Sequence, residues 1–432
     1  MEADEEKGVY EVLSERGFVE QVTDPEKISQ LLRGERVTCY IGFDPTASSF
    51  HVGSLIPIMA LAHMQRHGHR PVALAGGGTG LVGDPSGKQK MRQVLSYEEI
   101  RRNAEAQKKQ FALFLDFSED RALLLNNADW LTRLNYIDFL RDIGVHFSVN
   151  RMLATESVKL RLQTGLSFIE FNYQLLQAYD FWHLFKYYDC LMQMGGSDQW
   201  GNIVAGIDLI RRLEGKQAYG MTFPLIMTAD GKKMGKTEKG AIWLDADRTS
   251  PYEYYQFWVN TDDRDVGQFL ALFTFLPMEK IEEYHKLEGA GLREAKEVLA
   301  YEATKIVHGE QEARKARSAS RAIFGQSKVV ELHANITGTS STPDIDIEDD
   351  GIPTEYVLDE KFDQAIPAFK LFFETASLCA SGSEAKRLIT QGGAYIDNRK
   401  VEKFDELIKL EDNMLLRAGK KKYKRIKKVT KK

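Results

Sequence analysis

The chain has 432 residues, 43% of them hydrophobic and 28% charged, which is enough to bury several cores and suggests two or three domains. Its formal net charge is −5, and no apolar run approaches the roughly 20 residues that span a bilayer. The first residues are acidic, where a targeting peptide would be basic, so we expect a cytoplasmic protein, or one of an organelle interior if a presequence has been removed, without membrane contact. The three cysteines show no metal-ligand spacing, so neither disulfides nor a metal site is expected.

The first half of the chain alternates predicted strands and helices. Val37–Phe43 is β-branched and aromatic, as in a buried strand, and Pro71–Ala75 forms a second such run. Between them we expect a helix from Gly53 to His67, with Pro57 in its first turn. Two strands joined by a helix form a parallel βαβ unit, so residues 1–248 are predicted to be a doubly wound, Rossmann-like α/β domain.

The sequence His51-Val52-Gly53-Ser54 opens this helix after a strand and its loop. Free N–H groups and the helix dipole make such a start a binding place for anionic phosphates. Gly53 would allow a flat base to approach the backbone, and His51 with Thr46 could donate to phosphate oxygens. The alternative is that His51 only caps the helix.

Three glycines, Gly78, Gly80 and Gly83, match the G-x-G-x-x-G pattern of dinucleotide-binding folds. The context does not fit, because Asp84-Pro85 follows where a helix should already run, and the acids about 20 residues on lie in a helical run. We therefore prefer a tight glycine turn that presents Asp84 over a nicotinamide site.

A polar stripe marks a later predicted helix. Tyr173, Gln177 and Asp180 are spaced i, i+4 and i+7, so they share one helix face, whereas the residues around them are apolar almost all round. On such a buried helix the Asp180 carboxylate needs hydrogen-bond partners. These are either other side chains or a polar ligand.

Two further segments carry polar groups beside glycines. In Gly195–Asn202, which links a strand to a helix, Asp198 and Gln199 supply an acceptor and an amide for ribose hydroxyls or a carbonyl, or else the segment is a turn with a helix cap. In a later glycine-containing loop, Lys233 and Lys236 would stabilise charge on a departing pyrophosphate. A solvated hairpin turn is the alternative there.

The rest of the chain changes character twice. Residues 249–324 are mainly helical in pattern and are predicted to form a separate domain, and residues 325–362, rich in Ser, Thr, Gly, Pro and acids, form a linker. Residues 363–432 combine short helical and strand patterns in a small α+β domain. Its end, residues 417–432, carries ten Lys and Arg and no acid, so it attracts polyanions or is a solvated disordered end.

Together the motifs resemble those of the bacterial-type tyrosyl-tRNA synthetases, a family of class I aminoacyl-tRNA synthetases. The resemblance spans nearly the whole chain, through the stretches CYIGFDPT, HVGS, GGGTGLVGDPSG, NNADW, HFSVN, FNYQLLQAYDF, MGGSDQWGN, KKMGKT and SPYEYYQFWVNTDDRDV. The C-terminal module is similar to an S4 RNA-binding domain. Ser54, Gly235 and Thr237 depart from the general class motifs, which have His and two Ser at these places.

The resemblance implies an enzyme that activates L-tyrosine with ATP and Mg²⁺, without a permanently bound cofactor, and charges tRNA(Tyr) as a homodimer. Tyr40 and Asp180 would hold the substrate phenol, Asp84, Tyr173 and Gln177 would hold its α-ammonium, and Gln199 would lie near its carboxylate. The nucleotide would contact Gly42, Asp44, His51, Gly53, Ser54, Gly196, Asp198, Lys233 and Lys236. Thr46, His51, Lys233 and Lys236 would stabilise the reacting phosphates, and Lys420, Lys421, Lys422, Lys424 and Arg425 would bind tRNA.

Two other interpretations stay open from the sequence. The tryptophanyl enzymes share the fold, although the paired phenol ligands Tyr40 and Asp180 favour tyrosine. An RNA-binding protein that keeps the fold without charging tRNA would fit the basic end, although the intact ligand set argues against it. No nucleophile or poised general base is evident, and none is needed, because the substrate carboxylate itself attacks the α-phosphorus.

Overall fold

The computed structural model describes residues 7–86, 95–231, 234–237, 240–324, 352–362, 365–397, 399–419 and 422–429. The chain divides into two compact units, Met1–Thr249 with Val259–Val307, and Ser250–Trp258 with His308–Lys432. The region predicted as a helical domain, 249–324, is therefore shared between the two units. Within the described residues, no helix is both long and apolar enough to cross a membrane.

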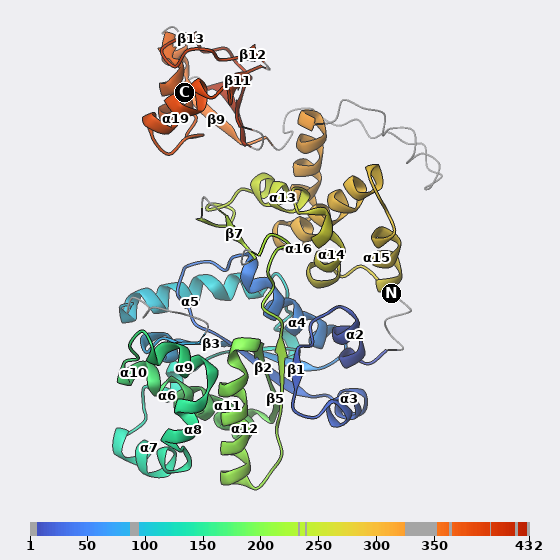
Figure 1. The fold of residues 1–432 in the computed structure, drawn as a ribbon, viewed down its shortest axis with the longest axis vertical. Coiled ribbons are helices and arrows are strands. Elements are labelled where there is room, and N and C mark those ends of the chain that lie inside the picture. The colour runs from blue at the N-terminus through green and yellow to red at the C-terminus, as the bar shows by residue number, and fades with distance from the viewer. Residues whose placement is uncertain are drawn as a thin grey trace. The chain divides into compact units, whose positions relative to one another are not determined.

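A six-stranded sheet forms the centre of the first unit (Figure 1). The strand order is β1-β6-β5-β2-β3-β4, in which β1 pairs antiparallel with β6 and all other neighbours are parallel. Nearly every residue of β2 and β3 is buried, as expected for parallel strands covered by helices on both faces. The strands are β1 (Gln21–Val22), β2 (Thr38–Phe43), β3 (Arg70–Ala75), β4 (Leu123–Asn126), β5 (Cys190–Gly196) and β6 (Tyr219–Phe223). The predicted doubly wound α/β fold is confirmed.

Helices cover both faces of this sheet (Figure 1). The helix predicted from Gly53 starts with a 3₁₀ turn at Val52–Ser54, so its α-helical part, α4, begins at Leu55. It is apolar almost all round because it packs against strands on one side and other helices on the other. The helices of this region are α2 (Val9–Glu15), α3 (Pro25–Gly34), α4 (Leu55–Arg66), α5 (Tyr97–Phe111), α6 (Ala128–Leu131), α7 (Tyr136–Asp142), α8 (Val149–Ala154), α9 (Glu156–Leu162), α10 (Phe168–Phe171), α11 (Tyr173–Tyr188) and α12 (Trp200–Glu214).

After the sheet the chain is helical, as predicted. A short hairpin comes first, formed by β7 (Lys236–Thr237) and β8 (Gly240–Ala241). The helices are α13 (Pro251–Val259), α14 (Val266–Phe273), α15 (Met278–His285) and α16 (Ala290–Phe324). The α16 segment is interrupted at Gly309, whose φ of +83° is not helical.

The C-terminal residues form a small α+β fold. Five strands pair in the order β12-β11-β14-β15-β9, and β10 pairs with β13. Apolar residues of both the helices and the strands make one core, which includes Leu371, Phe372, Ile389 and Leu416. The elements are β9 (Thr354–Leu358), β10 (Ala365–Pro367), α18 (Ala368–Lys370), a π-helical turn (Leu371–Thr375), α19 (Gly382–Thr390), β11 (Ala394–Ile396), β12 (Arg399–Lys400), β13 (Leu407–Lys409), β14 (Met414–Ala418) and β15 (Lys422–Val429).

Two features of this region differ from the prediction. The linker does not extend to residue 362, because Thr354–Leu358 forms β9 and pairs in parallel with β15. Most of the basic end is not a disordered tail, because Lys422–Val429 forms β15, a strand paired on both edges, with Tyr423 and Ile426 buried. Residues 325–351 of the predicted linker, together with Lys420 and Lys421, lie outside the described residues.

Candidate active site

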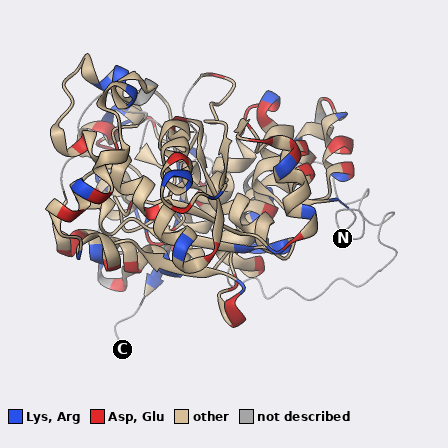
Figure 2. Cartoon of the chain, turned by 90° about the horizontal axis from the view of Figure 1, so that it is seen from below, with Lys and Arg blue, Asp and Glu red and all other residues tan. Residues whose placement is uncertain are grey.

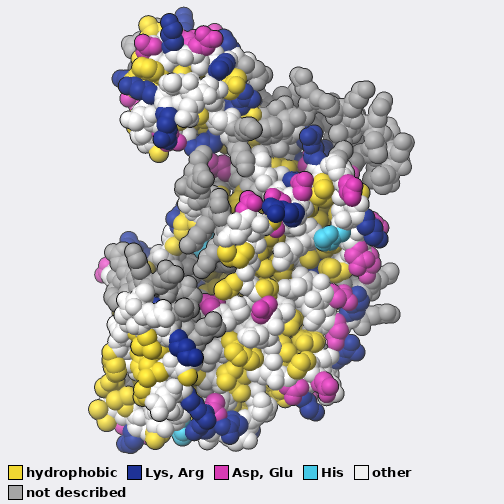
Figure 3. All heavy atoms as spheres, viewed as in Figure 1, with side chains coloured by type: hydrophobic (Ala, Val, Ile, Leu, Met, Phe, Trp, Pro, Cys, Tyr) yellow, Lys and Arg dark blue, Asp and Glu magenta, His cyan; other side chains and the backbone are white. Residues whose placement is uncertain are grey.

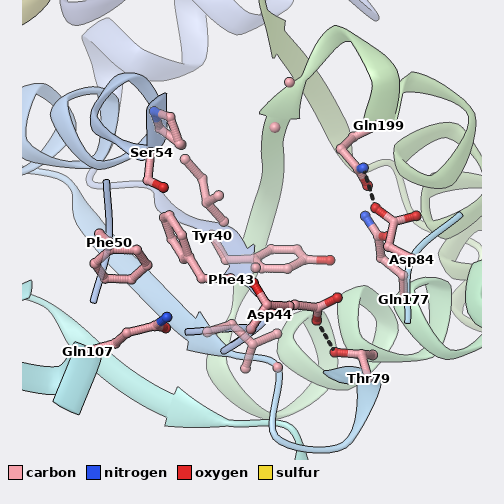
Figure 4. A pocket seen from close by; sticks show the side chains of 18 of the residues that line it. Tyr40, Phe43, Asp44, Phe50, Ser54, Thr79, Asp84, Gln107, Gln177 and Gln199 are labelled. Carbon is pink, nitrogen blue, oxygen red and sulfur yellow. Dashed lines mark hydrogen bonds between the residues drawn. The ribbon is translucent and has the colours of Figure 1, made fainter. Parts of the chain in front are cut away.

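A cavity of about 580 Å³ lies where strands β2 and β5 end (Figure 4). Carboxyl ends of parallel strands share one edge of a sheet, which is where such folds bind ligands. The predicted tyrosine and nucleotide residues whose side chains are described all line this cavity: Tyr40, Gly42, Asp44, Thr46, His51, Gly53, Ser54, Asp84, Tyr173, Gln177, Asp180, Gly196, Asp198 and Gln199. Residues as far apart in the sequence as Tyr40 and Gln199 therefore line one pocket.

The Asp180 carboxylate is a buried polar group of this cavity, with 2% of the residue exposed. Its Oδ1 accepts a hydrogen bond from Trp130 Nε1 at 2.7 Å, and its Oδ2 accepts one from Asn127 Nδ2 at 2.8 Å. A carboxylate offers about four acceptor positions, so two donors leave capacity for a ligand. The hydroxyl of Tyr40 is also buried and has no hydrogen-bond partner among the described residues. The two groups can receive one phenol hydroxyl, with Asp180 as acceptor and Tyr40 as donor.

Burial perturbs both of these groups. It raises the pKa of Asp180 from 3.8 to about 7, against the lowering effect of the hydrogen bonds from Asn127 and Trp130. Burial, and then the charge of Asp180, raise the pKa of the Tyr40 phenol well above its usual value of 10. The Tyr40 hydroxyl therefore remains protonated and available as a donor. Perturbed titratable groups in a cleft are typical of functional sites.

The Asp84 carboxylate forms a second polar group in the cavity. Gln199 Nε2 donates to Asp84 Oδ2 at 2.7 Å, as Figure 4 shows, and the backbone N–H of Ser86 donates to Oδ1 at 2.9 Å. Gly83, at φ +87°, makes the tight turn that precedes it. Gln199, which is predicted to lie near the substrate carboxylate, is therefore hydrogen-bonded to Asp84, which is predicted to hold the α-ammonium.

Two more predicted residues reach the cavity from α11. The Tyr173 hydroxyl donates to Asp44 Oδ2 at 3.0 Å, and Thr79 Oγ1 donates to Asp44 Oδ1 at 2.8 Å. One turn further along, Gln177 Oε1 accepts from Asn202 Nδ2 at 2.9 Å. These bonds fix the orientation of the Asp44 carboxylate and of the Gln177 amide, and Gln177 lies beside Asp84 (Figure 4).

His51 caps the 3₁₀ turn that begins α4. Its Nδ1 accepts from the backbone N–H of Gly53 at 3.0 Å, and its ring packs edge-on against Trp243 with 5.9 Å between centroids. His51 therefore does cap the helix, as considered from the sequence, and it uses Nδ1 to do so. The residue lines the cavity as well.

The loop that carries Lys233 and Lys236, called the lysine loop below, is described only in part. Lys233 lies outside the described residues, and Lys236 begins β7, but its side chain is not described. The backbone connects this loop to the start of α4: Gly235 O accepts from Ile242 N at 3.2 Å, and Ile242 O accepts from Val52 N at 2.9 Å. The two segments that the sequence singled out are thus joined by main-chain hydrogen bonds.

Sequence reasoning assigned no role to Asn127 and Trp130, which orient Asp180. Asn127 also accepts from the N–H of Gly78 at 2.8 Å and donates to Thr79 Oγ1 at 3.0 Å, so it connects the glycine turn to the site. A Cβ on Gly77 would collide with the side chain of Asn126, the last residue of β4, so glycine at this position allows the turn to approach that strand closely. The stretch NNADW was the available signal.

Across the described part of the chain, no group of three or more His, Cys, Asp and Glu side chains is placed to hold a metal ion. The cavity instead combines a buried acceptor and donor, a carboxylate with amides beside it, and a helix start near a lysine loop. This set suits a polar amino acid next to a phosphorylated nucleotide.

The chain as a whole is similar to known proteins. A family model described as class I tRNA synthetases (W and Y) matches residues 32–325. The chain is 57% identical over 426 residues to a tyrosine–tRNA ligase of Desulfatibacillum aliphaticivorans, covering 97% of this chain and 98% of that protein. It is 56% identical over 428 residues to that of Syntrophus aciditrophicus, covering 98% and 99%. A C-terminally truncated mitochondrial tyrosyl-tRNA synthetase of Aspergillus nidulans superposes with a TM-score of 0.67 at 33% identity, covering 74% of this chain and 94% of that one.

The fold is therefore that of a class I aminoacyl-tRNA synthetase of the tryptophan and tyrosine branch. Within this branch, the chain belongs to the tyrosine–tRNA ligase family. The resemblance inferred from the sequence motifs is confirmed.

Proposed function

We propose that the chain activates L-tyrosine with ATP, forming tyrosyl-adenylate and pyrophosphate, and then transfers tyrosine to the 3′-terminal ribose of tRNA(Tyr). The observation that carries the amino-acid assignment is the Tyr40 hydroxyl, which has no hydrogen-bond partner in the described part of the chain and shares its cavity with the buried Asp180 carboxylate. Phenylalanine would leave the Tyr40 hydroxyl desolvated without an acceptor and would leave the remaining acceptor capacity of Asp180 unused. Tyrosine-specific synthetases are the standard case of such rejection. The indole of tryptophan is only a donor, so it would leave the Tyr40 hydroxyl without an acceptor.

The chemistry needs no protein nucleophile. The carboxylate of tyrosine would attack the α-phosphorus of ATP and expel pyrophosphate, while Asp84, Tyr173 and Gln177 hold the α-ammonium. Thr46 and His51, with Lys233 and Lys236 from the loop, would stabilise the charge on the leaving phosphates. Gly42, Asp44, Gly53, Ser54, Gly196 and Asp198 would complete the nucleotide site. ATP would enter with Mg²⁺ on its phosphates as a substrate, and no resident cofactor is part of the proposal.

Amino-acid-dependent exchange of labelled pyrophosphate into ATP tests this reaction. We expect exchange with tyrosine and none with the other nineteen amino acids. Exchange with tryptophan alone would mean that the chain activates tryptophan rather than tyrosine. Absence of exchange with every amino acid, in protein shown to be folded, would favour an RNA-binding protein that does not charge tRNA.

Transfer to tRNA would use the C-terminal fold. Acidic and basic side chains are mixed over the chain (Figure 2), but β15 carries Lys422, Lys424, Arg425, Lys427 and Lys428. Because β9 belongs to the same sheet, a truncation that removes the whole fold must end before Thr354, for example at residue 324, rather than at residue 362. Such a protein should still form tyrosyl-adenylate and should fail to charge tRNA; full charging would reject a tRNA-binding role. Since charged tRNA is used by ribosomes, we propose a cytoplasmic location.

An exposed apolar surface supports a homodimer. Large apolar side chains of α7 to α10 and the turns between them are exposed, among them Ile137 (66%), Val145 (71%) and Phe168 (70%). Figure 3 shows hydrophobic side chains gathered at the lower left, where these elements lie in the same view of Figure 1. Single exposed apolar residues are normal, but a patch of this kind marks an interface. Phe168→Asp should give a monomer by light scattering, whereas Leu113→Asp, at an exposed position outside the patch, should not.

A further inference from the structure

One aromatic side chain outside the cavity contacts Trp130, which donates a hydrogen bond to Asp180. The imidazole of His183 stacks on the indole of Trp130, with 4.2 Å between ring centroids and 17° between planes. His183 does not line the cavity, whereas Asp180, to which the indole donates, does. No substrate-binding role was expected of His183 from the sequence.

The direction of the Trp130 N–H depends on the plane of the indole. That N–H is the only donor of the side chain, and its bond to Asp180 Oδ1 is 2.7 Å long. The indole sits on α6, a helix of only four residues, so local secondary structure holds it weakly. A ring stacked face to face on the indole restricts its tilt and thereby the direction of the donor.

The α11 helix supplies both ends of this arrangement. Asp180 and His183 are three residues apart, so they lie on neighbouring positions of one helix face. The chain of contacts therefore runs from Asp180 to Trp130 by a hydrogen bond and from Trp130 back to α11 by a stack. A change in the tilt of the Trp130 indole would therefore alter its hydrogen bond to the Asp180 carboxylate.

His183 acts as a neutral ring in this position. Burial lowers its pKa below 6.5, so the imidazole is mostly uncharged at neutral pH. On its other sides it meets the rings of Tyr187 at 4.7 Å and of Tyr179 and Tyr188 at 6.3 Å each. The stack is thus an aromatic contact within an aromatic cluster.

We propose that His183 is a positioning residue for recognition of the tyrosine hydroxyl: by stacking on Trp130 it fixes the donor that orients Asp180. The proposal rests on the tyrosine specificity proposed above. It predicts an effect on tyrosine and on the discrimination between tyrosine and phenylalanine, because Asp180 serves the phenol. It predicts no effect on ATP, whose predicted contacts are other residues of the cavity.

The deciding comparison is His183→Leu against His183→Phe, because both side chains fill the space and only phenylalanine can stack. In tyrosine-dependent pyrophosphate exchange we expect His183→Leu to raise the KM for tyrosine about fivefold to tenfold and to lower tyrosine-over-phenylalanine selectivity by a similar factor. The KM for ATP should stay within about twofold, and His183→Phe should resemble the wild type. Trp182→Leu is the control, since the Trp182 indole contacts Tyr179, Tyr187 and Lys186 and donates to Glu214 rather than to Asp180.

Three results would overturn the proposal: an unchanged KM for tyrosine in His183→Leu, an equal rise in both KM values, or a His183→Phe variant as impaired as His183→Leu. If His183→Leu does not fold, the proposal stands or falls on whether His183→Phe retains wild-type selectivity. Failure of the proposed function would be visible separately, because the wild type itself would then show no tyrosine-dependent exchange.

Discussion

Gly53 and Gly235 face each other so closely that a Cβ on Gly235 would lie 2.8 Å from the backbone N of Gly53. From the other side, a Cβ on Gly53 would lie 3.1 Å from the carbonyl oxygen of Met234. The helix start and the lysine loop, about 180 residues apart in the chain, therefore meet backbone to backbone. A serine at position 235, as in the general class motif, would not fit this contact.

The contact predicts that Gly235→Ala slows pyrophosphate exchange by tenfold or more in kcat, with little change in the KM for tyrosine. Gly235 has φ +78°, and alanine there costs about 1–2 kcal/mol in backbone strain in addition to the collision with Gly53. Gly231→Ala is the matched control, because Gly231 has φ +73° but a Cβ there would meet no atom within 4 Å. Equal losses in the two variants would show that strain, rather than the contact, matters.

The unpartnered hydroxyl of Tyr40 predicts opposite effects on stability and binding. Tyr40→Phe removes a buried polar group that lacks a partner within the described residues, so the free energy of unfolding should be unchanged or rise by about 1 kcal/mol. The KM for tyrosine should rise about tenfold, since a donor to the phenol is lost. Tyr252→Phe, at another buried hydroxyl without a described partner, should leave the KM unchanged. Unfolding in urea and exchange kinetics measure the two effects, and a stable Tyr40→Phe variant with normal KM would remove Tyr40 from the site.

Strands of the sheet and helices that line the cavity could be predicted from local sequence patterns. Strands β2 and β3 are continuous apolar runs bounded by turn residues, and α11 shows its polar stripe in the spacing of Tyr173, Gln177 and Asp180. Local pattern also indicated that Asp180 needs partners. It could not name them, because Asn127 and Trp130 come from a segment 50 residues earlier that only the fold brings alongside.

The C-terminal strand shows a second limit. In β15 the buried residues Tyr423 and Ile426 are three apart, which is not the alternation of a half-buried strand, because two faces of the strand are covered by different clusters. The Lys and Arg between them dominate the composition. Charge therefore suggested a tail where pairing on both edges makes a strand.

The raised pKa of Asp180 predicts a pH dependence of stability. The folded protein holds a proton on this group up to about pH 7, whereas the unfolded chain releases it near 3.8. The stabilising effect of that proton is complete below about pH 4 and is lost as pH rises to about 7, by up to about 4 kcal/mol. Asp180→Asn cannot ionise, so without substrate its stability relative to the wild type should increase between pH 5 and pH 8 in urea unfolding.

The control for this titration is Asp208→Asn. Burial alone would raise the pKa of Asp208, but hydrogen bonds from Arg211 and Arg212 lower it below its usual value. The Asp208 carboxylate therefore stays ionised throughout this pH range. Its stability difference from the wild type should be the same at pH 5 and pH 8. Parallel pH curves for Asp180→Asn and the wild type would mean that Asp180 is already ionised at pH 5.

The partners of the basic side chains on β15 predict which of them are available to tRNA. Lys424 pairs with Glu355 at 3.0 Å and Lys422 donates to the carbonyl oxygen of Leu378 at 2.7 Å, whereas Lys427 has no ion-pair partner among the described residues. Lys427→Ala and Lys424→Ala remove the same charge, but only the first should remove a phosphate contact. We expect Lys427→Ala to weaken tRNA binding and to reduce the slope of log affinity against log salt by about one, and Lys424→Ala to leave the slope unchanged. Equal slopes for both variants and the wild type would place the tRNA contacts elsewhere on this fold.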